Sequence, residues 1–226
     1  MKNSIITHTD PKSPISEAFR NMRTNVHYTN IDKEIKVIQI TSSIQSEGKS
    51  TIAANYAVTL AQSGKKVLII DCDLRRPNIH RMFALPNING LTNVLIRENQ
   101  LEKCIKYTKV ENLFVLVAGP IPPNPSEMLE SNRMKDIITT VKENFDVVIL
   151  DSPPVLPVSD ALIISNLADG TIVNVAVGIT ERDLFKRTID SLENVGSNII
   201  GTVVNKASTN DKRYNSYGYN YEYKAD

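Results

Sequence analysis

Six short runs of β-branched and aliphatic residues recur along the chain, and none shows the alternation of a half-exposed strand. They span residues 37–41, 67–71, 113–118, 147–151, 171–177 and 199–205. Nearly continuous apolar runs are typical of strands that are buried on both faces of a parallel sheet. The segments between them are long enough for helices, so the sequence predicts a doubly wound α/β fold with a mostly parallel sheet.

Helical patterns fill the spaces between the runs. We expect helices over residues 50–63, 127–143 and 181–195, the first and last of which stop at Gly64 and Gly196. A further helix is expected near residues 15–28, and the proline-rich segment 119–125 predicts a stiff loop.

The length and pattern of the chain favour one folded core with two distinct ends. We divide the sequence into an N-terminal helical segment (1–36), a core (37–206) and a tyrosine-rich tail (207–226).

Charge and cysteine content exclude several classes of protein. The 26 basic and 25 acidic residues give a net charge of +1, which argues against nucleic acid as a partner. Cys72 and Cys104 are too few for a disulfide framework or a zinc site, and we expect buried, reduced thiols. The apolar stretch at the N-terminus is too short for a signal peptide, and no apolar run has the length needed to span a membrane. We therefore expect a cytoplasmic protein.

The first expected strand runs into Ser-Ser-Ile-Gln-Ser-Glu-Gly-Lys-Ser-Thr (42–51), after which a helix is expected. Strand, loop and helix in this order form the context of a Walker A phosphate loop, whose backbone N–H groups cradle phosphates. Lys49 would reach the β- and γ-phosphates, and the Ser50 hydroxyl would hold Mg²⁺. The predicted nucleotide-binding residues in this loop are Ser43, Gln45, Ser46, Glu47, Gly48, Lys49, Ser50 and Thr51.

The loop departs from the usual pattern because Ser43 stands where a Walker A loop has its first glycine. The alternative interpretation is a simple helix N-terminus that happens to contain a lysine.

Three aspartates end two of the expected strands. Asp151 follows Val-Val-Ile-Leu and is a candidate Walker B carboxylate, although an aspartate before prolines also fits turn chemistry. Asp71 and Asp73 end another strand, beside Arg75 and Arg76. Two carboxylates near Mg²⁺ can divide the work of orienting the metal and accepting a proton, whereas the simpler alternative is a solvated turn whose charges pair locally.

These motifs together resemble the bacterial tyrosine kinases of capsule and exopolysaccharide synthesis, in particular the cytoplasmic kinase subunits of Gram-positive bacteria. The likeness rests on Ser-Glu-Gly-Lys-Ser-Thr (46–51), Ile-Ile-Asp-Cys-Asp-Leu-Arg-Arg-Pro (69–77) as Walker A′, Val-Val-Ile-Leu-Asp-Ser-Pro-Pro (147–154) as Walker B, and the segment 119–127. It implies the P-loop NTPase fold, ATP and Mg²⁺ as cofactors, and protein-tyrosine kinase activity.

The resemblance also implies roles for individual residues. Asp71 corresponds to the base for the tyrosine hydroxyl, Asp73 and Asp151 would serve the metal with Ser50, and Lys49 would act on the phosphates. Asn205 lies where related ATPases contact adenine. The family often places Pro and Gly where this chain has Gln45 and Ser46, which makes turnover the property most affected by the departure.

The tail packs five of the eight tyrosines into ten residues with no aliphatic partner, a composition that cannot form a core. A stacking platform for single-stranded nucleic acid lacks the expected basic residues, and a tail without function is a second alternative. The kinase resemblance implies instead a cluster of phosphoacceptors, in which each phosphate adds about −1.5 to −2 charges. The predicted acceptors are Tyr214, Tyr217, Tyr219, Tyr221 and Tyr223.

Glu17, Arg20 and Arg23 are spaced three residues apart along one side of the expected N-terminal helix. Pairing within the helix explains this spacing, but Glu-x-x-Arg-x-x-Arg also resembles the subunit-contact motif through which the family's kinases form rings. Phosphorylation between subunits would follow from the second interpretation.

The sequence as a whole predicts an ATP-dependent protein-tyrosine kinase that modifies its own tail. The resemblance implies a transmembrane adaptor of polysaccharide export, peripheral membrane location, ring assembly and an opposing protein-tyrosine phosphatase. One alternative is a partitioning or positioning ATPase of the same fold. That class usually carries a second lysine where this chain has Ile44, which argues against it. The other is a catalytically weak scaffold, suggested by Ser43, Gln45 and Ser46.

Overall fold

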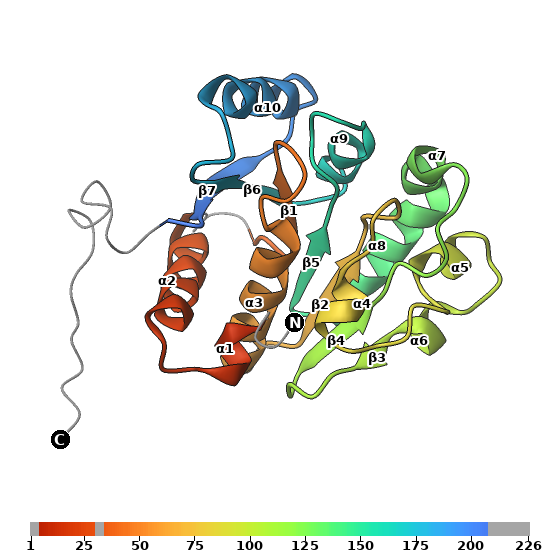
Figure 1. Cartoon of the computed structure of the whole chain (residues 1–226). Helices are drawn as coiled ribbons and strands as arrows, with labels where there is room; N and C mark the ends of the chain where they lie inside the picture. Colours follow the sequence, from red (N-terminus) through yellow and green to blue (C-terminus); the bar gives the residue numbers. More distant parts are fainter. Residues whose placement is uncertain (1–4, 30–33, 208–226) are drawn as a thin grey trace.

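A twisted seven-stranded sheet forms the centre of the molecule (Figure 1). The computed structural model describes residues 5–29 and 34–207. The strands are β1 (Val37–Ser42), β2 (Val67–Asp71), β3 (Lys106–Tyr107), β4 (Leu113–Leu116), β5 (Val147–Asp151), β6 (Gly170–Ala176) and β7 (Ile199–Asn205). Their order is β3-β4-β2-β5-β1-β6-β7, and every neighbouring pair is parallel except β3 with β4. The predicted mostly parallel sheet is confirmed.

The edge strand β3 was not anticipated from the sequence. It contains two residues, and the side chain of Tyr107 is 80% exposed. Because this strand is antiparallel and lies at the sheet edge, it lacks the apolar run by which the buried strands are recognised.

Helices cover both faces of the sheet. They are α1 (Ile6–Thr9), α2 (Pro14–Thr29), α3 (Lys49–Gln62), α4 (Ile79–Met82), α5 (Leu91–Leu95), α6 (Leu101–Cys104), α7 (Pro125–Glu130), α8 (Asn132–Asn144), α9 (Asp160–Ser165) and α10 (Arg182–Asn194). Ile69 of β2 belongs to the core cluster beneath α3, whereas its neighbours Leu68 and Ile70 belong to the cluster beneath α8. Burial on alternate faces explains why the strands read as uninterrupted apolar runs.

The single helix expected over residues 127–143 is in fact two helices, α7 and α8, so that expectation is wrong. Ser131 separates them with an extended backbone, and its Oγ accepts a hydrogen bond from the backbone N–H of Met134 at 3.2 Å. Serine is a preferred N-cap because its side chain satisfies a backbone donor of the first turn. The apolar pattern continues across this break, which is why the pattern alone did not reveal it.

The N-terminal helices α1 and α2 pack against α3, as Figure 1 shows. The backbone N–H and the hydroxyl of Thr7 both donate to Asn55 Oδ1 at 3.0 Å, and Gln62 Nε2 donates to the carbonyl of Thr7. These bonds attach the described part of the N-terminal segment to the core, and the proposed boundary at residue 36 stays a prediction.

The state of the cysteines and the character of the helices can be read directly from the structure. Cys72 and Cys104 are both buried and free. Over residues 5–29 and 34–207, none of the helices has the length and apolar character needed to cross a membrane.

Asp169 connects the start of β1 to the helix layer. Its Oδ2 accepts hydrogen bonds from the backbone N–H groups of Lys36 and Val37 at 3.0 and 2.9 Å, and its Oδ1 lies 2.6 Å from Lys142 Nζ of α8. Burial disfavours the ionised carboxylate, but Lys142 and the two backbone donors outweigh it, so the pKa of Asp169 lies below its ordinary value. The ionised form therefore stabilises the folded chain.

Replacing Asp169 with asparagine should lower the free energy of unfolding by about 1–3 kcal/mol at pH 7, because the ion pair with Lys142 is lost and the backbone N–H groups then bond to a neutral oxygen instead of a charged one. A carboxyl whose folded pKa is depressed stabilises above its unfolded pKa of about 3.9, and this contribution disappears as the pH falls through the folded pKa. The difference between Asp169→Asn and wild type should thus shrink below about pH 4.

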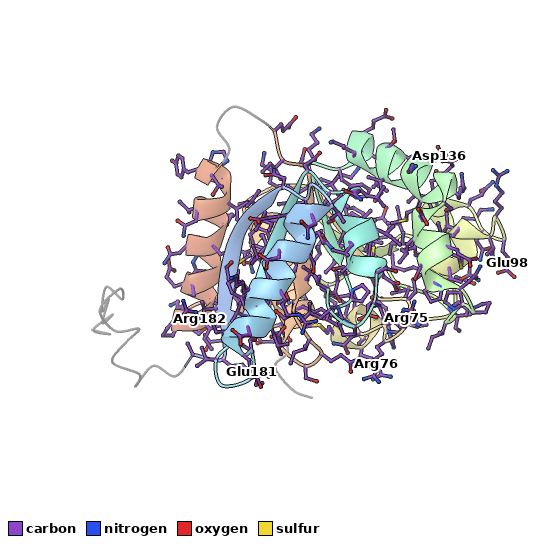
Figure 2. The ribbon with its side chains drawn as sticks, turned by 90° about the horizontal axis from the view of Figure 1, so that it is seen from above. Arg75, Arg76, Glu98, Asp136, Glu181 and Arg182 are labelled. Atoms are coloured by element: carbon purple, nitrogen blue, oxygen red, sulfur yellow. The ribbon has the colours of Figure 1, made fainter. Side chains whose placement is uncertain are left out.

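Urea denaturation at pH 7 and at pH 3 measures both quantities. Asp136→Asn is the matched control, since Asp136 is exposed on α8 (Figure 2). A cost for Asp169→Asn that equals the control, or that persists unchanged at pH 3, would contradict the assignment.

Candidate active site

A cleft of about 320 Å³ opens at the carboxyl ends of β1, β2 and β5, where parallel α/β proteins bind ligands. The loop that follows β1 lines one side of the cleft, with Lys49 and Ser50 at the start of α3. Asp73 and Arg76 line another side, and Pro153 and Pro154 follow Asp151 on a third. A larger hollow of about 660 Å³ beside α2 and α3 contains none of the predicted phosphate-binding residues.

The phosphate loop contains two left-handed backbone positions. Gly48 has φ 96° and precedes the first residue of α3, and Ser46 has φ 66°. A non-glycine residue in the left-handed region costs roughly 1–2 kcal/mol. Ser46 therefore carries a backbone strain that a glycine at this position would remove.

Glu47 connects the phosphate loop to β6, to β7 and to Thr180. Its buried carboxylate accepts hydrogen bonds from the backbone N–H of Ile44 at 3.1 Å and from the hydroxyl of Thr180. Its backbone carbonyl accepts the side-chain amides of Asn174 and Asn205, both at 2.9 Å. The side chain of Glu47 is thus occupied inside the protein, and its remaining group for a phosphate is the backbone N–H.

Lys49 lies between two of the predicted carboxylates. Its Nζ is 2.9 Å from Asp73 Oδ2 and 3.7 Å from Asp151 Oδ1, and all three side chains are largely buried. Burial opposes the charge on Lys49, but Asp151 and Asp73 outweigh it and raise the lysine pKa. Lys49 therefore remains a cation at the mouth of the phosphate loop.

The oxygen donors near Lys49 fit a magnesium ion. Asp151 is fully buried, and among the described residues neither of its carboxylate oxygens accepts a hydrogen bond. Burial raises the pKa of Asp151, while the nearby charge of Lys49 lowers it in part. Unsatisfied buried carboxylate oxygens beside a hydroxyl and a second carboxylate are the hard donors that Mg²⁺ prefers. The predicted metal residues Ser50, Asp73 and Asp151 are therefore brought together.

Asp71 is as fully buried as Asp151 and does not line the cleft. It lies opposite Asp151 in the β2–β5 register, its Oδ2 accepts the backbone N–H groups of Asn78 and Ile79 at 2.9 and 3.0 Å, and its side chain is fully buried. Burial and the charge of Asp151 raise the pKa of Asp71 well above its ordinary value, against the hydrogen bond from Ile79. Asp71 thus holds the turn before α4, while Asp73 faces the cleft.

The alternative of a solvated, self-neutralising turn at Asp71 and Asp73 is wrong, because both carboxylates are buried. Arg75 instead forms a two-point ion pair with Asp160, with distances of 2.8 and 3.1 Å, and also donates to Ser126 Oγ. No motif in the sequence pointed to Asp160, which lies 85 residues from Arg75. Ser126, 51 residues from Arg75, belongs to the quoted segment 119–127, but the motif gave it no role.

The remaining predicted residues are placed as follows. Asn205 Nδ2 is bound to the carbonyl of Glu47 and its Oδ1 accepts the N–H of Lys206, so the predicted adenine contact stays a prediction. Gln45 accepts a hydrogen bond from Arg76, Ser43 is buried and Thr51 is exposed. The five tail tyrosines lie outside the described residues.

On α2, Glu17 and Arg20 form the expected pair within the helix at 2.7 Å. Arg20 also donates to the carbonyl of Pro11, and Arg23 donates to the carbonyl of Thr59 on α3. The pairing within one chain is therefore present, and the subunit contact stays a prediction.

A strand, phosphate loop and helix with a buried lysine–carboxylate cluster define a P-loop nucleotide-binding protein. The family model described as "AAA domain" matches residues 35–182. The fold is similar to that of the septum site-determining protein MinD from Pyrococcus horikoshii, solved in complex with Mg-ADP. The TM-score is 0.65 and the identity 25%, over 75% of this chain and 69% of that one.

Two further relatives specify the family. The chain is 41% identical over 219 residues to tyrosine-protein kinase YwqD of Bacillus subtilis, covering 97% of this chain and 92% of that one. The crystal structure of the chimerical protein CapA2B2 matches with a TM-score of 0.89 and 40% identity, over 91% of both chains. The chain belongs to the bacterial tyrosine-protein kinase family.

Replacing Gly48 with alanine should weaken nucleotide binding at least tenfold, which corresponds to about 1.4 kcal/mol. A Cβ at Gly48 would lie 2.3 Å from Asn205 Nδ2, so the amide that holds the carbonyl of Glu47 would have to move. Titration with a fluorescent ATP analogue in the presence of Mg²⁺ measures the change.

Gly64→Ala is the matched control, because Gly64 has a similar φ of 86° at the other end of α3 but nothing within 4 Å of its Cβ position. Both variants carry the backbone strain, and only Gly48→Ala disturbs the loop. Equal nucleotide affinities for the two variants would show that the contact with Asn205 is unimportant.

Proposed function

We propose that this chain is an ATP-dependent protein-tyrosine kinase that phosphorylates tyrosines of its own C-terminal tail. The observation that carries the proposal is the cluster of Lys49, Asp73 and Asp151 around the phosphate loop, in a chain that matches a tyrosine-protein kinase over nearly its whole length. A phosphate loop with these neighbours can position a triphosphate and neutralise charge during transfer.

The phosphate loop from Ser43 to Thr51 would hold ATP through its backbone N–H groups and the N-terminus of α3. Lys49 would contact the phosphate oxygens in exchange for part of its contact with Asp73. Ser50, Asp73 and Asp151 would hold Mg²⁺, which neutralises charge on the phosphates when bound.

Asp71 is the proposed base for the tyrosine hydroxyl, by resemblance, and the geometry adds a condition to that role. Its Oδ2 accepts hydrogen bonds from the backbone N–H groups of Asn78 and Ile79, and its Oδ1 accepts a longer one from the backbone N–H of Asp73 at 3.3 Å. Proton transfer would therefore use the remaining lone pair of Oδ1. The raised pKa of Asp71 brings it closer to the range in which a carboxylate accepts a proton near neutral pH.

The acceptors in this proposal are Tyr214, Tyr217, Tyr219, Tyr221 and Tyr223, offered by one subunit to the site of the next. Glu17, Arg20 and Arg23 on α2 would contribute to the subunit contact, exchanging some of their present contacts for contacts with a neighbour. A transmembrane adaptor of polysaccharide export would hold the kinase at the inner side of the membrane, and a protein-tyrosine phosphatase would reverse the modification.

Incubation of the full chain with Mg-ATP should produce phosphotyrosine on tail peptides, as measured by mass spectrometry. Lys49→Met should abolish the signal, and Asp71→Asn should reduce the rate about 10²–10⁴-fold, the usual contribution of a general base. An asparagine at position 71 keeps an oxygen that can accept the Asn78 and Ile79 hydrogen bonds, so the turn is preserved.

Excess Mg²⁺ distinguishes the two aspartates. Asp73→Asn should regain part of its activity at high Mg²⁺ because it weakens metal binding, whereas Asp71→Asn should not. The exposed variant Asp136→Asn serves as the control with unchanged activity. Steady ATP hydrolysis with no phosphotyrosine would reject the kinase proposal in favour of a partitioning-type ATPase.

Phosphorylation between subunits is tested by mixing two forms, neither of which can phosphorylate its own tail. One carries Lys49→Met with an intact tail, and the other carries an intact site with all five tail tyrosines changed to phenylalanine. We expect phosphotyrosine on the Lys49→Met chain only in the mixture, and a charge reversal at Arg20 should reduce it. A mixture without signal, beside an active wild type, would show that transfer occurs within one chain.

A further inference from the structure

A second groove, of about 620 Å³, adjoins the phosphate cleft and is positively charged. It shares Arg75, Arg76 and Asn78 with the cleft and continues along α4 to Arg81. Figure 2 shows Arg75 and Arg76 side by side at this margin of the molecule. No lining residue of the groove carries a carboxylate.

The charges of this arginine groove are mostly uncompensated. Arg75 is paired with Asp160, but among the described residues neither Arg76 nor Arg81 forms an ion pair. Among the described residues, the Arg76 guanidinium donates only to the neutral Gln45 side chain, and Arg76 is exposed, as is Arg81. Two exposed guanidinium groups in one hollow favour an anion, and their planar donors suit phosphate oxygens.

Other side chains of the groove fit an aromatic phosphate ester better than a free phosphate. Pro120 and Ile121 form an apolar part of its lining, and the side chain of Ile121 is 64% exposed. Nδ1 of His80 is buried and has no hydrogen-bond partner among the described residues. Burial and the neighbouring Arg81 lower the pKa of His80, so at neutral pH the arginines supply the charge.

We propose that this groove binds a phosphotyrosine of the C-terminal tail and thereby positions a second tyrosine of the same tail at the phosphate cleft. The proposal rests on the proposed kinase function for the origin of the phosphotyrosine. It makes modification of the tail ordered, because the first phosphate recruits the tail for the next transfer.

The spacing of the tail tyrosines agrees with this arrangement. Tyr217, Tyr219, Tyr221 and Tyr223 occur at every second position. In an extended peptide, alternate residues point to the same side about 6.5–7 Å apart, so one can occupy the groove while another faces the adjoining cleft. Residues 208–226 contain three basic and three acidic side chains, so the unmodified tail offers no excess negative charge, whereas one phosphate adds about −1.5 to −2.

Peptide binding tests the inference without using catalysis. The protein is the full chain with its five tail tyrosines changed to phenylalanine, held with saturating Mg-ADP so that the phosphate loop is occupied. The probes are fluorescent peptides of residues 212–226, unmodified or with phosphotyrosine at position 221. We expect the phosphopeptide to bind at least tenfold more tightly, and Arg81→Glu to remove this preference.

Arg187→Glu is the matched control, since Arg187 is exposed on α10, which contributes no residue to the groove. It should retain the preference. Equal affinity for the two peptides, an equal response of the Arg81 and Arg187 variants, or a phosphopeptide preference that appears only when Mg-ADP is left out would overturn the inference. The last outcome would place the phosphate in the phosphate loop.

The same variants separate this inference from the proposed function. If no phosphotransfer occurs but the phosphopeptide still binds more tightly than the unmodified peptide, the kinase function is rejected and the groove assignment is retained. With an active kinase, Arg81→Glu should raise KM for the phosphorylated peptide at least tenfold, with little change in kcat and no change for the unmodified peptide. An active kinase that shows no such KM difference would reject the groove alone.

Discussion

The burial of Lys49 among Asp71, Asp73 and Asp151 is the constraint on which the rest of the site depends. If all four groups are ionised, the cluster has three negative charges and one positive charge, held away from water. Charges buried in this way are costly unless they are paired, hydrogen-bonded or neutralised. The raised pKa of Asp71 relieves part of that cost, and a divalent cation beside Asp151 would relieve more.

The surrounding structure holds these groups in place through bonds that cross the sheet. Glu47 joins the phosphate loop to β6, β7 and Thr180, and Arg75 joins the end of β2 to α7 and α9. At the opposite end of the strands, Asp169 secures the start of β1 against α8. The phosphate loop is thus positioned by contacts that come from distant parts of the chain.

Much of the fold could be predicted because buried parallel strands have a simple signature. The six apolar runs became β1, β2, β4, β5, β6 and β7, with ends shifted by at most two residues. This signature did not reveal a strand at the sheet edge or a helix boundary that is set by one hydrogen-bonding side chain. The edge strand β3 has no apolar run, and the single side chain of Ser131 divides an otherwise continuous helical pattern.

The sequence by itself determined the sheet, the phosphate loop and the carboxylates, because strand pattern and motif spacing are local properties of the chain. It did not determine which carboxylate would face the cleft. Only the tertiary structure showed Asp71 bound to the turn before α4, Glu47 held by Thr180, and Arg76 and Arg81 sharing a groove with Ile121. The physical reason is that hydrogen bonds and charge compensation join side chains far apart in the sequence, as with Glu47 and Thr180, which are separated by 133 residues.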